Sequence, residues 1–222
     1  MRPSTPVRTR LIIVGGGEHA RVIAQLARSR PELWEVEGFV DREECREMAE
    51  AMDAPHLGND ETLPGLLQQD PARKVVLGVG SLGASDKRPR IVERLRIETE
   101  RWANVIDSSA QVAAGVHLGH GVVVMPGALI NCGASLGEHS VINTGAIIEH
   151  DVQVGAFVQV GPGAAIGGGA VLGRNCYIGL GARVRDHVTV ESGATVGMGA
   201  VVVASVPGNV TVMGVPARIQ KR

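Results

Sequence analysis

The stretch INTGAIIEHDVQVGAFVQVGPGAAIGGG, residues 142–169, decides the fold of this chain. An aliphatic residue recurs in it at every sixth position, and the same spacing continues in both directions without a break. The aliphatic residues at this spacing are Ile106, Val112, Leu118, Val124, Ile130, Leu136, Ile142, Ile148, Val154, Val160, Ile166, Leu172, Ile178, Val184, Val190, Val196 and Val202. A small residue, mostly Ala, often stands two positions before them. Three positions before them often stands Gly, Asn, Asp or His, and these residue types tolerate the left-handed backbone of a sharp corner.

Each hexad is therefore expected to be a short strand followed by a corner, so that three hexads form one triangular coil of about 18 residues. The aliphatic residue points inward and stacks on its counterpart in the neighbouring coil. The pattern predicts a left-handed parallel β-helix over residues 105–206, with the inward residues as core and not as functional candidates. The alternative is a β-sandwich with accidental spacing, which an unbroken series of this length argues against.

The preceding residues show alternating strand and helix patterns instead of the hexad. The expected strands are 11–14, 36–40 and 74–79, and the expected helices are 19–30, 60–69 and 86–98. The last two helices each begin with an Asp suited to an N-cap. This alternation predicts a small parallel α/β domain of Rossmann-like type. The expected division is an N-terminal tail (1–9), the Rossmann-like domain (10–104), the β-helix (105–206) and a C-terminal tail (207–222).

Composition excludes several classes of protein. Charged residues make up 20% of the chain and the formal net charge is −1, so there is no electrostatic footprint for nucleic acid. No apolar run is long enough to cross a membrane, and the polar, basic N-terminus does not have the form of a secretory signal. The three cysteines, Cys45, Cys132 and Cys176, lack metal-ligand spacing and are expected to be free thiols of a cytoplasmic protein.

Four segments of the chain resemble one branch of the hexapeptide acyltransferases, namely the sialic acid O-acetyltransferases and bacillosamine N-acetyltransferases. They are LIIVGGGEHARV (11–22), GFVDRE (38–43), the stretch 142–169, and GVPARI (214–219). The resemblance implies acetyl-CoA as cosubstrate, lying between neighbouring β-helices of a homotrimer. It also implies a free or nucleotide-linked sugar that is held partly by the N-terminal domain.

His150 is the candidate catalytic base. It stands two positions after the inward Ile148, so it is expected to face outward, and an imidazole is suited to accept a proton near neutral pH. Asp151 is expected to hold the ring in one tautomer, with Glu149 as a rival for that role. In the family that this chain resembles, such a His-acid pair is the catalytic one.

Two further residues are candidates for contact with the acetyl group. Gly168 follows His150 by one whole coil, so its N–H is a candidate oxyanion donor, and the family uses a glycine there. A plain corner glycine is the alternative. Gln159 stands nine residues after His150, where relatives commonly carry a second His. Its amide can donate a hydrogen bond to a thioester carbonyl but cannot act as a base.

The glycine turn at residues 15–17 is the candidate substrate site of the N-terminal domain. Gly15, Gly17 and Ala20, with Asp41 further on, match a dinucleotide-binding fingerprint, which taken alone indicates an NAD enzyme. A domain of this size is too small for both halves of a dinucleotide fold. The resemblance instead places a nucleotide sugar here, with His19 near phosphate and Asp41 near the base or ribose. The alternative is a turn needed only for strand-helix packing.

These observations predict acetyl transfer to an amino group of a nucleotide-activated amino sugar, with O-acetylation of a sugar such as sialic acid as the runner-up. A non-catalytic trimeric scaffold is a third possibility. No metal is expected, because the histidine pair with four residues between them that marks the trimeric zinc carbonic anhydrases does not occur here. The basic residues at the C-terminus, Arg218, Lys221 and Arg222, either meet the coenzyme's phosphates or form a solvated end.

Overall fold

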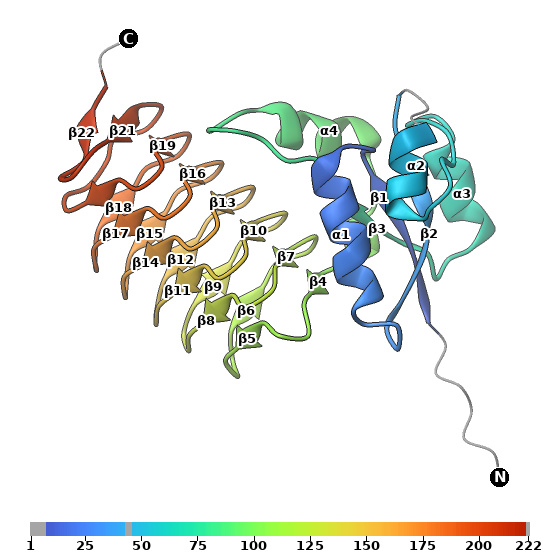
Figure 1. Ribbon diagram of the computed structural model, residues 1–222, viewed down its shortest axis with the longest axis horizontal. Coiled ribbons are helices and arrows are strands. Elements are labelled where there is room, and N and C mark those ends of the chain that lie inside the picture. Colours follow the sequence, from blue (N-terminus) through green and yellow to red (C-terminus); the bar gives the residue numbers. More distant parts are fainter. Residues whose placement is uncertain (1–7, 43–45, 221–222) are drawn as a thin grey trace. The chain divides into compact units, whose positions relative to one another are not determined.

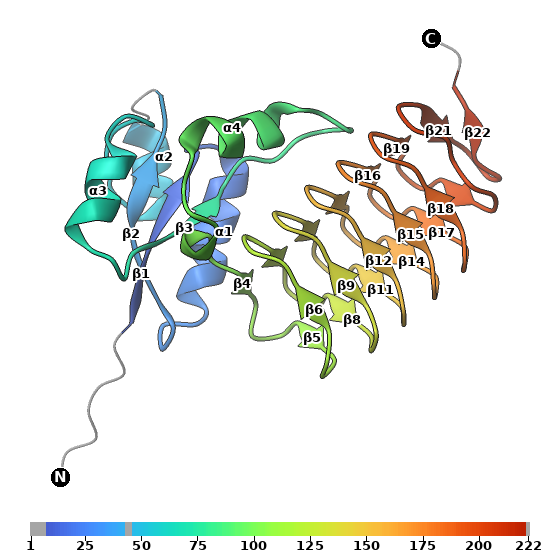
Figure 2. The ribbon, with the colours of Figure 1, turned by 180° about the vertical axis from the view of Figure 1, so that it is seen from behind.

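The computed structural model describes residues 8–42 and 46–220, which form two compact units. The α/β unit holds the chain up to Gly80 together with Val92–Ser108, and the β-helix unit holds Ser81–Ile91 together with the chain from Ser109 onward. Figures 1 and 2 show each unit from two opposite sides. Both predicted fold types, the small parallel α/β domain and the β-helix, are confirmed.

The α/β unit is built on a three-stranded parallel sheet in the order β2-β1-β3. The strands are β1 (Thr9–Val14), β2 (Trp34–Val40) and β3 (Lys74–Leu77), and the other elements are α1 (Glu18–Arg28), α2 (Arg46–Met52), α3 (Leu63–Gln69), η1 (Thr99–Arg101) and β4 (Val105–Ile106). The central strand is aliphatic from Leu11 to Val14 and fully buried there, as expected for a parallel strand covered on both faces. Helix α1 turns its apolar residues, such as Ile23 and Leu26, into the core.

The α/β unit differs from the expectation in its helices. Helix α2 was not predicted. Helix α3 begins at Leu63 with Thr62 as its N-cap residue, and Asp60 forms an ion pair with Arg94 instead of capping. The predicted helix 86–98 is shorter, since α4 spans Lys87–Leu95.

The β-helix unit has three faces, each a sheet in which the strands of successive coils are parallel (Figure 1). Face 1 contains β7 (Val123–Val124), β10 (Val141–Ile142), β13 (Gln159–Val160), β16 (Tyr177–Ile178), β19 (Thr195–Val196), β21 (Thr211–Met213) and the antiparallel β22 (Arg218–Ile219). Face 2 contains β5 (Gln111–Val112), β8 (Leu129–Ile130), β11 (Ile147–Ile148), β14 (Ala165–Ile166), β17 (Arg183–Val184) and β20 (Val201–Val202). Face 3 contains β6 (His117–Leu118), β9 (Ser135–Leu136), β12 (Gln153–Val154), β15 (Val171–Leu172) and β18 (Thr189–Val190).

The register of these sheets stacks the hexad aliphatic residues on one another. Ile142 pairs with Val160 on face 1, and Ile148 pairs with Ile166 on face 2. From Val124 to Val202 all the predicted inward residues are buried. Val112 and Leu118 are only half-buried because they belong to the first coil of this unit, which has no earlier coil of the unit to cover it.

Residues Ser81–Ile91, which we call the strap, pack on the β-helix although they precede it by many residues. The Ala84 N–H donates to Thr195 Oγ1 over 3.0 Å. The Arg88 side chain is 1% exposed and donates to the carbonyls of His139 (2.6 Å) and Phe157 (3.3 Å). The strap thus covers a corner next to face 1 and leaves the corner between faces 2 and 3 open for a site.

Candidate active site

His150 and Asp151 form a hydrogen-bonded pair on the corner between β11 and β12. Nδ1 of His150 lies 2.9 Å from Oδ2 of Asp151, and the His150 side chain is 56% exposed. Asp151 has a φ of 61°, a left-handed conformation that Asp adopts more readily than most residues. The inward Ile148 anchors the strand, so the next corner projects the imidazole outward, as the hexad pattern predicts.

The pair is arranged for proton transfer. The hydrogen bond that Asp151 accepts from the ring raises the pKa of His150 above its ordinary value, with smaller contributions from the charges of Asp151 and Glu149. Because Nδ1 faces Asp151, Nε2 is the nitrogen left to accept a proton. The carboxylate of Glu149 accepts a hydrogen bond from Nδ2 of Asn131 at 2.9 Å, so Asp151 is the hydrogen-bonding partner of His150.

Gly168 lies against the imidazole of His150 from the next coil. The two corners are joined through the backbone, because the Gly169 N–H donates to the His150 carbonyl over 2.9 Å. A Cβ built on Gly168 would stand only 2.6 Å from Nε2 of His150. Among residues 8–42 and 46–220 no hydrogen bond uses the Gly168 N–H. An N–H group with no partner among the described residues therefore lies on the corner next to the imidazole of His150.

Gln159 lies on face 1 and contacts the strap. Its side chain is buried, its Nε2 donates to Ser81 Oγ over 2.5 Å, and its Oε1 accepts from the Ser81 N–H at 3.4 Å. Within the described residues of this single chain, Gln159 makes no hydrogen bond with His150. Ser81 was missed by sequence reasoning, since its only signal is its position in the Gly- and Ser-rich stretch after β3.

The glycine turn between β1 and α1 is closed by Asp41. The Gly16 N–H donates to Oδ2 of Asp41 over 2.5 Å, and Oδ1 accepts from the Arg42 N–H at 2.6 Å. Gly15 has a φ of 110°, whereas Gly17, the N-cap residue of α1, is extended with a φ of −96°. The left-handed φ in this turn therefore belongs to Gly15 and not to Gly17.

The N-terminus of α1 presents an open surface. A Cβ at Gly17 would meet no atom within 4 Å, and the helix leaves its first N–H groups without partners in the helix. His19 lies in the first turn, half-buried, beside Gly80. Such a helix end attracts anionic groups such as phosphate. The structure thus brings Gly15, Gly17, His19 and Asp41 together around one turn.

Among the described residues, no group of three or more His, Cys, Asp or Glu side chains is placed to hold a metal ion. His139 is a buried corner residue, and burial together with the charge of Arg88 lowers its pKa to about 4. Cys132 is an exposed thiol, burial raises the pKa of the Cys176 thiol to about 11, and Cys45 lies outside the described residues. Lys221 and Arg222 also lie outside them. No described helix has the length and apolar character needed to cross a bilayer.

Comparison with known proteins identifies the family. Residues 10–95 match the family model of the PglD N-terminal domain. A variant of perosamine N-acetyltransferase from Caulobacter crescentus, solved with CoA and GDP-perosamine, is 32% identical, with a TM-score of 0.82 over 96% of this chain and 97% of that chain. This chain belongs to the hexapeptide-repeat nucleotide-amino-sugar acetyltransferases. The resemblance stated from the four sequence segments is confirmed, and the chain is an acyltransferase.

Two further solved structures resemble this sugar acetyltransferase. The acetyltransferase domain of PglB from Neisseria gonorrhoeae, solved with acetyl coenzyme A, is 30% identical, with a TM-score of 0.83 over 96% of this chain and all of that domain. WeeI from Acinetobacter baumannii is 22% identical and has a TM-score of 0.70 over 96% of this chain and all of that one, which supports the fold alone. Among the curated proteins none matched the sequence.

Proposed function

We propose that this sugar acetyltransferase moves the acetyl group of acetyl-CoA to the amino group of a nucleotide-activated amino sugar, with His150 as general base. The observation that carries the proposal is the exposed imidazole of His150, which is hydrogen-bonded to Asp151 through Nδ1 and lies against Gly168 on the side of Nε2. The relatives support both substrates, since one is a complex with CoA and GDP-perosamine and another a complex with acetyl coenzyme A.

The chemistry follows from these three residues. The neutral amine attacks the thioester carbonyl carbon and forms the C–N bond, while its proton passes to Nε2 of His150. The carbonyl oxygen becomes an oxyanion that the Gly168 N–H stabilises. The C–S bond then breaks, the sulfur leaves with the electron pair, and the imidazolium returns the proton to it. An amide and CoA result, and His150 is neutral again.

The glycine turn of the α/β unit is proposed to bind the sugar nucleotide. The open N-terminus of α1 accepts phosphate oxygens, with Gly17 allowing close approach and His19 beside it. Asp41 holds the turn through Gly16, and its remaining lone pairs can accept hydrogen bonds from a ribose or base. Because a Cβ at Gly17 meets nothing in the protein, Gly17→Val probes ligand approach without a built-in clash.

The test of this second site uses Gly17→Val and Gly15→Ala as a contrast. Gly17→Val is expected to raise the KM for the sugar nucleotide about tenfold or more, which corresponds to losing a phosphate contact worth ~1.4 kcal/mol or more. Acetyl-CoA affinity by calorimetry should stay at the wild-type value. Gly15→Ala should lower the melting temperature instead, because Gly15 has a φ of 110° and its Cβ would stand 2.8 Å from Val79. Unchanged sugar kinetics in a folded Gly17→Val protein would make the turn purely structural.

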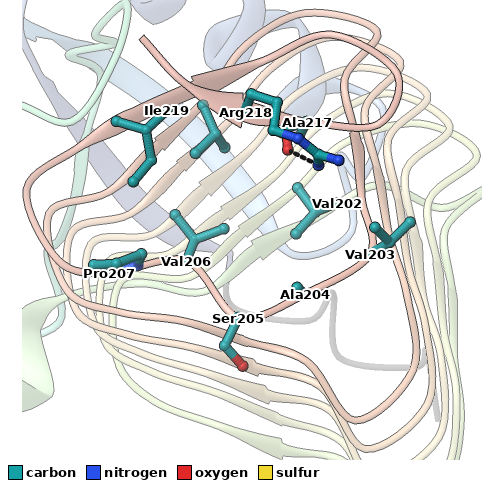
Figure 3. A pocket seen from close by; sticks show the side chains of 10 residues that line it. Val202, Val203, Ala204, Ser205, Val206, Pro207, Ala217, Arg218 and Ile219 are labelled. Atoms are coloured by element: carbon teal, nitrogen blue, oxygen red, sulfur yellow. Dashed lines mark hydrogen bonds between the residues drawn. The ribbon is translucent and has the colours of Figure 1, made fainter. Parts of the chain in front are cut away.

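The acyl donor is proposed to lie along the corner that carries His150. A hollow of about 140 Å³ opens at the C-terminal end of the β-helix, with Val202, Val206 and Ile219 among its apolar walls and Arg218 beside it (Figure 3). Ala204 lines it and occupies the position of His150 three coils later, about 14 Å along the β-helix at the spacing of β-strands. An apolar slot with a cation at this distance suits the nucleotide end of the coenzyme whose thioester lies at His150.

A homotrimer completes the site in this proposal. One face of a β-helix cannot enclose a coenzyme and a sugar, and His150 projects away from its own chain. Leu180, Met198 and Val215 are large apolar side chains exposed on the β-helix unit, which a neighbouring subunit would cover. Sedimentation should show a trimer, and an active monomer would contradict this part of the proposal. The cytoplasmic location stays a prediction.

The decisive experiment is a thiol-release assay with acetyl-CoA and a panel of free and nucleotide-linked amino sugars. We expect thiol release only with a nucleotide-linked amino sugar and an amide in the product by mass spectrometry. Release with free sialic acid alone would replace this proposal by O-acetylation. Absence of acetyl-CoA binding by calorimetry would leave only the scaffold interpretation.

A further inference from the structure

We infer that Gly133 and Gly168 are positioning residues, which clamp the His150–Asp151 pair between the coil before it and the coil after it. This inference rests on the proposed role of the pair. Gly133 precedes Asp151 by one coil, and Gly168 follows His150 by one coil. The absence of a side chain at both positions gives the pair its orientation.

Gly168 is not required by its backbone conformation. Its φ lies outside the left-handed range, and the equivalent positions of the other coils carry side chains. These positions are Ala114, Cys132, His150, Asp186 and Ala204. A Cβ at Gly168 would stand 2.6 Å from Nε2, 2.7 Å from Cε1 and 3.1 Å from Cδ2 of His150. The imidazole therefore occupies the space that any side chain at residue 168 would need.

The side chain of Asp151 likewise occupies the space that a side chain at Gly133 would need. A Cβ at Gly133 would overlap Oδ1 of Asp151, while Oδ2 of the same carboxylate is the atom bonded to His150. The pattern recurs at other corners, where a side chain leans over the glycine one coil earlier, as His187 does over Gly169. Gly127, also at a corner, has a φ of 67° but nothing within 4 Å of its Cβ position. A corner glycine makes such a contact where the residue one coil later carries a side chain, and Gly127 makes none because Gly145 follows it by one coil.

The two contacts act on the pair from opposite sides. Asp151 leans toward the earlier coil and His150 toward the later one, yet Nδ1 and Oδ2 remain 2.9 Å apart. A side chain at residue 133 must move the carboxylate and lengthen that bond. A methyl group at residue 168 must move the ring away from the N–H that would stabilise the oxyanion. Asp151 and Glu149 are the charged groups that act on His150, so loss of the Asp151 bond removes the main cause of its raised pKa.

The first arm of the test compares Gly133→Asn with Gly127→Asn. Asn tolerates the left-handed region, so both variants should fold, and only the first places atoms against Asp151. NMR titration of His150, assigned with His150→Ala, should show its pKa falling toward the ordinary value of about 6.5 in Gly133→Asn and unchanged in Gly127→Asn. An equal pKa in wild type and in folded Gly133→Asn would overturn the clamp at this residue.

The second arm uses Gly168→Ala, which keeps the backbone N–H and adds only the methyl group. We expect kcat to fall about tenfold or more, with acetyl-CoA affinity and the melting temperature close to wild type. Wild-type kcat in this variant would show that residue 168 needs only its N–H and would overturn the steric role. The NMR arm requires no substrate, so the clamp can be judged even if wild type acetylates no sugar in the panel.

Discussion

His150 and His139 stand on two corners of the same repeat and have opposite acid-base properties. His150 is exposed and hydrogen-bonded to Asp151, and its pKa is raised. His139 is 3% exposed, stacks on Phe157 at 5.0 Å, and has its pKa lowered to about 4. The hexad places both rings on corners, since His150 stands two residues after the inward Ile148 and His139 stands three residues after the inward Leu136.

The difference comes from what covers each corner. Arg88 of the strap donates to the carbonyls of His139 and Phe157, and Arg174 lies over the Phe157 ring with its Cζ 4.7 Å from the centroid. Protonation of His139 would therefore put a positive charge in a buried site beside the guanidinium groups of Arg88 and Arg174. At the His150 corner, the contacts are a carboxylate and two glycines. One corner holds a neutral core histidine, and the other holds a candidate base.

The largest effect on turnover should come from removing the imidazole of His150. His150→Ala removes the proposed proton acceptor and leaves the aliphatic stack in place. Turnover should fall about 10²- to 10⁴-fold, which is the usual contribution of general base catalysis. The melting temperature should stay close to wild type, since the side chain is exposed.

The matched variant is His139→Asn, which keeps a residue type suited to the φ of 55° at that corner. It should lower the melting temperature and leave kcat within a few-fold of wild type at permissive temperature. Activity that survives in His150→Ala, measured by thiol release, would show that His150 is not the base. A loss of turnover in folded His139→Asn would remove the distinction between the two corners.

Much of this contrast is absent from the sequence pattern. The β-helix and the outward position of His150 follow from the hexad, because each inward aliphatic residue fixes the direction of its neighbours. The burial of His139 does not follow from it, since Arg88 and the strap come from a part of the chain that precedes the repeat. The Ser81–Gln159 contact escapes sequence reasoning for the same reason. In the α/β unit, Asp60 pairs with Arg94 rather than capping a helix, a long-range contact that local propensity cannot indicate.

A smaller effect is expected from Asp151→Asn. The amide suits the left-handed corner, with its φ of 61°, but it removes the carboxylate charge and leaves at most a weaker, neutral hydrogen bond to the ring, so the pKa of His150 should fall. Turnover at neutral pH should fall about tenfold or more, because a neutral amide can hold the ring in the wrong tautomer and does not stabilise the imidazolium that forms. The acidic limb of the pH profile of kcat/KM should move to lower pH. This limb reports the neutral, proton-accepting form of His150, and that form now persists to lower pH.

The control for Asp151→Asn is Glu149→Gln. Glu149 contributes to the pKa of His150 only through its charge, and its carboxylate is hydrogen-bonded to Asn131. In Glu149→Gln the acidic limb of the kcat/KM profile should move less than it does in Asp151→Asn. The turnover of Glu149→Gln should stay within a few-fold of wild type. If the two variants shift the limb equally, the hydrogen bond to Asp151 is not the main cause of the raised pKa.

The smallest expected effect is a dependence of stability on pH that belongs to His139. Its pKa is about 4 in the folded protein and about 6.5 when the chain is unfolded, so the unfolded state binds the proton more readily. The stabilisation of the neutral form is therefore complete above about pH 6.5 and is lost as the pH falls from there toward 4. At pH 5 the loss amounts to about 2 kcal/mol, from ~1.36 kcal/mol for each of ~1.5 pH units.

Urea unfolding followed by circular dichroism at pH 7.5 and 5.0 measures this loss. Carboxylates throughout the chain also titrate over this range, so the difference between wild type and His139→Asn isolates the contribution of His139. The wild-type protein should lose about 2 kcal/mol more than the variant between the two pH values. Because Arg88, His120 and Arg174 carry the charges that act on His139, high salt should reduce the difference only in part, since burial is the larger cause. Equal losses in the two proteins would mean that His139 accepts its proton without penalty, and the two histidine corners would then differ in exposure but not in chemistry.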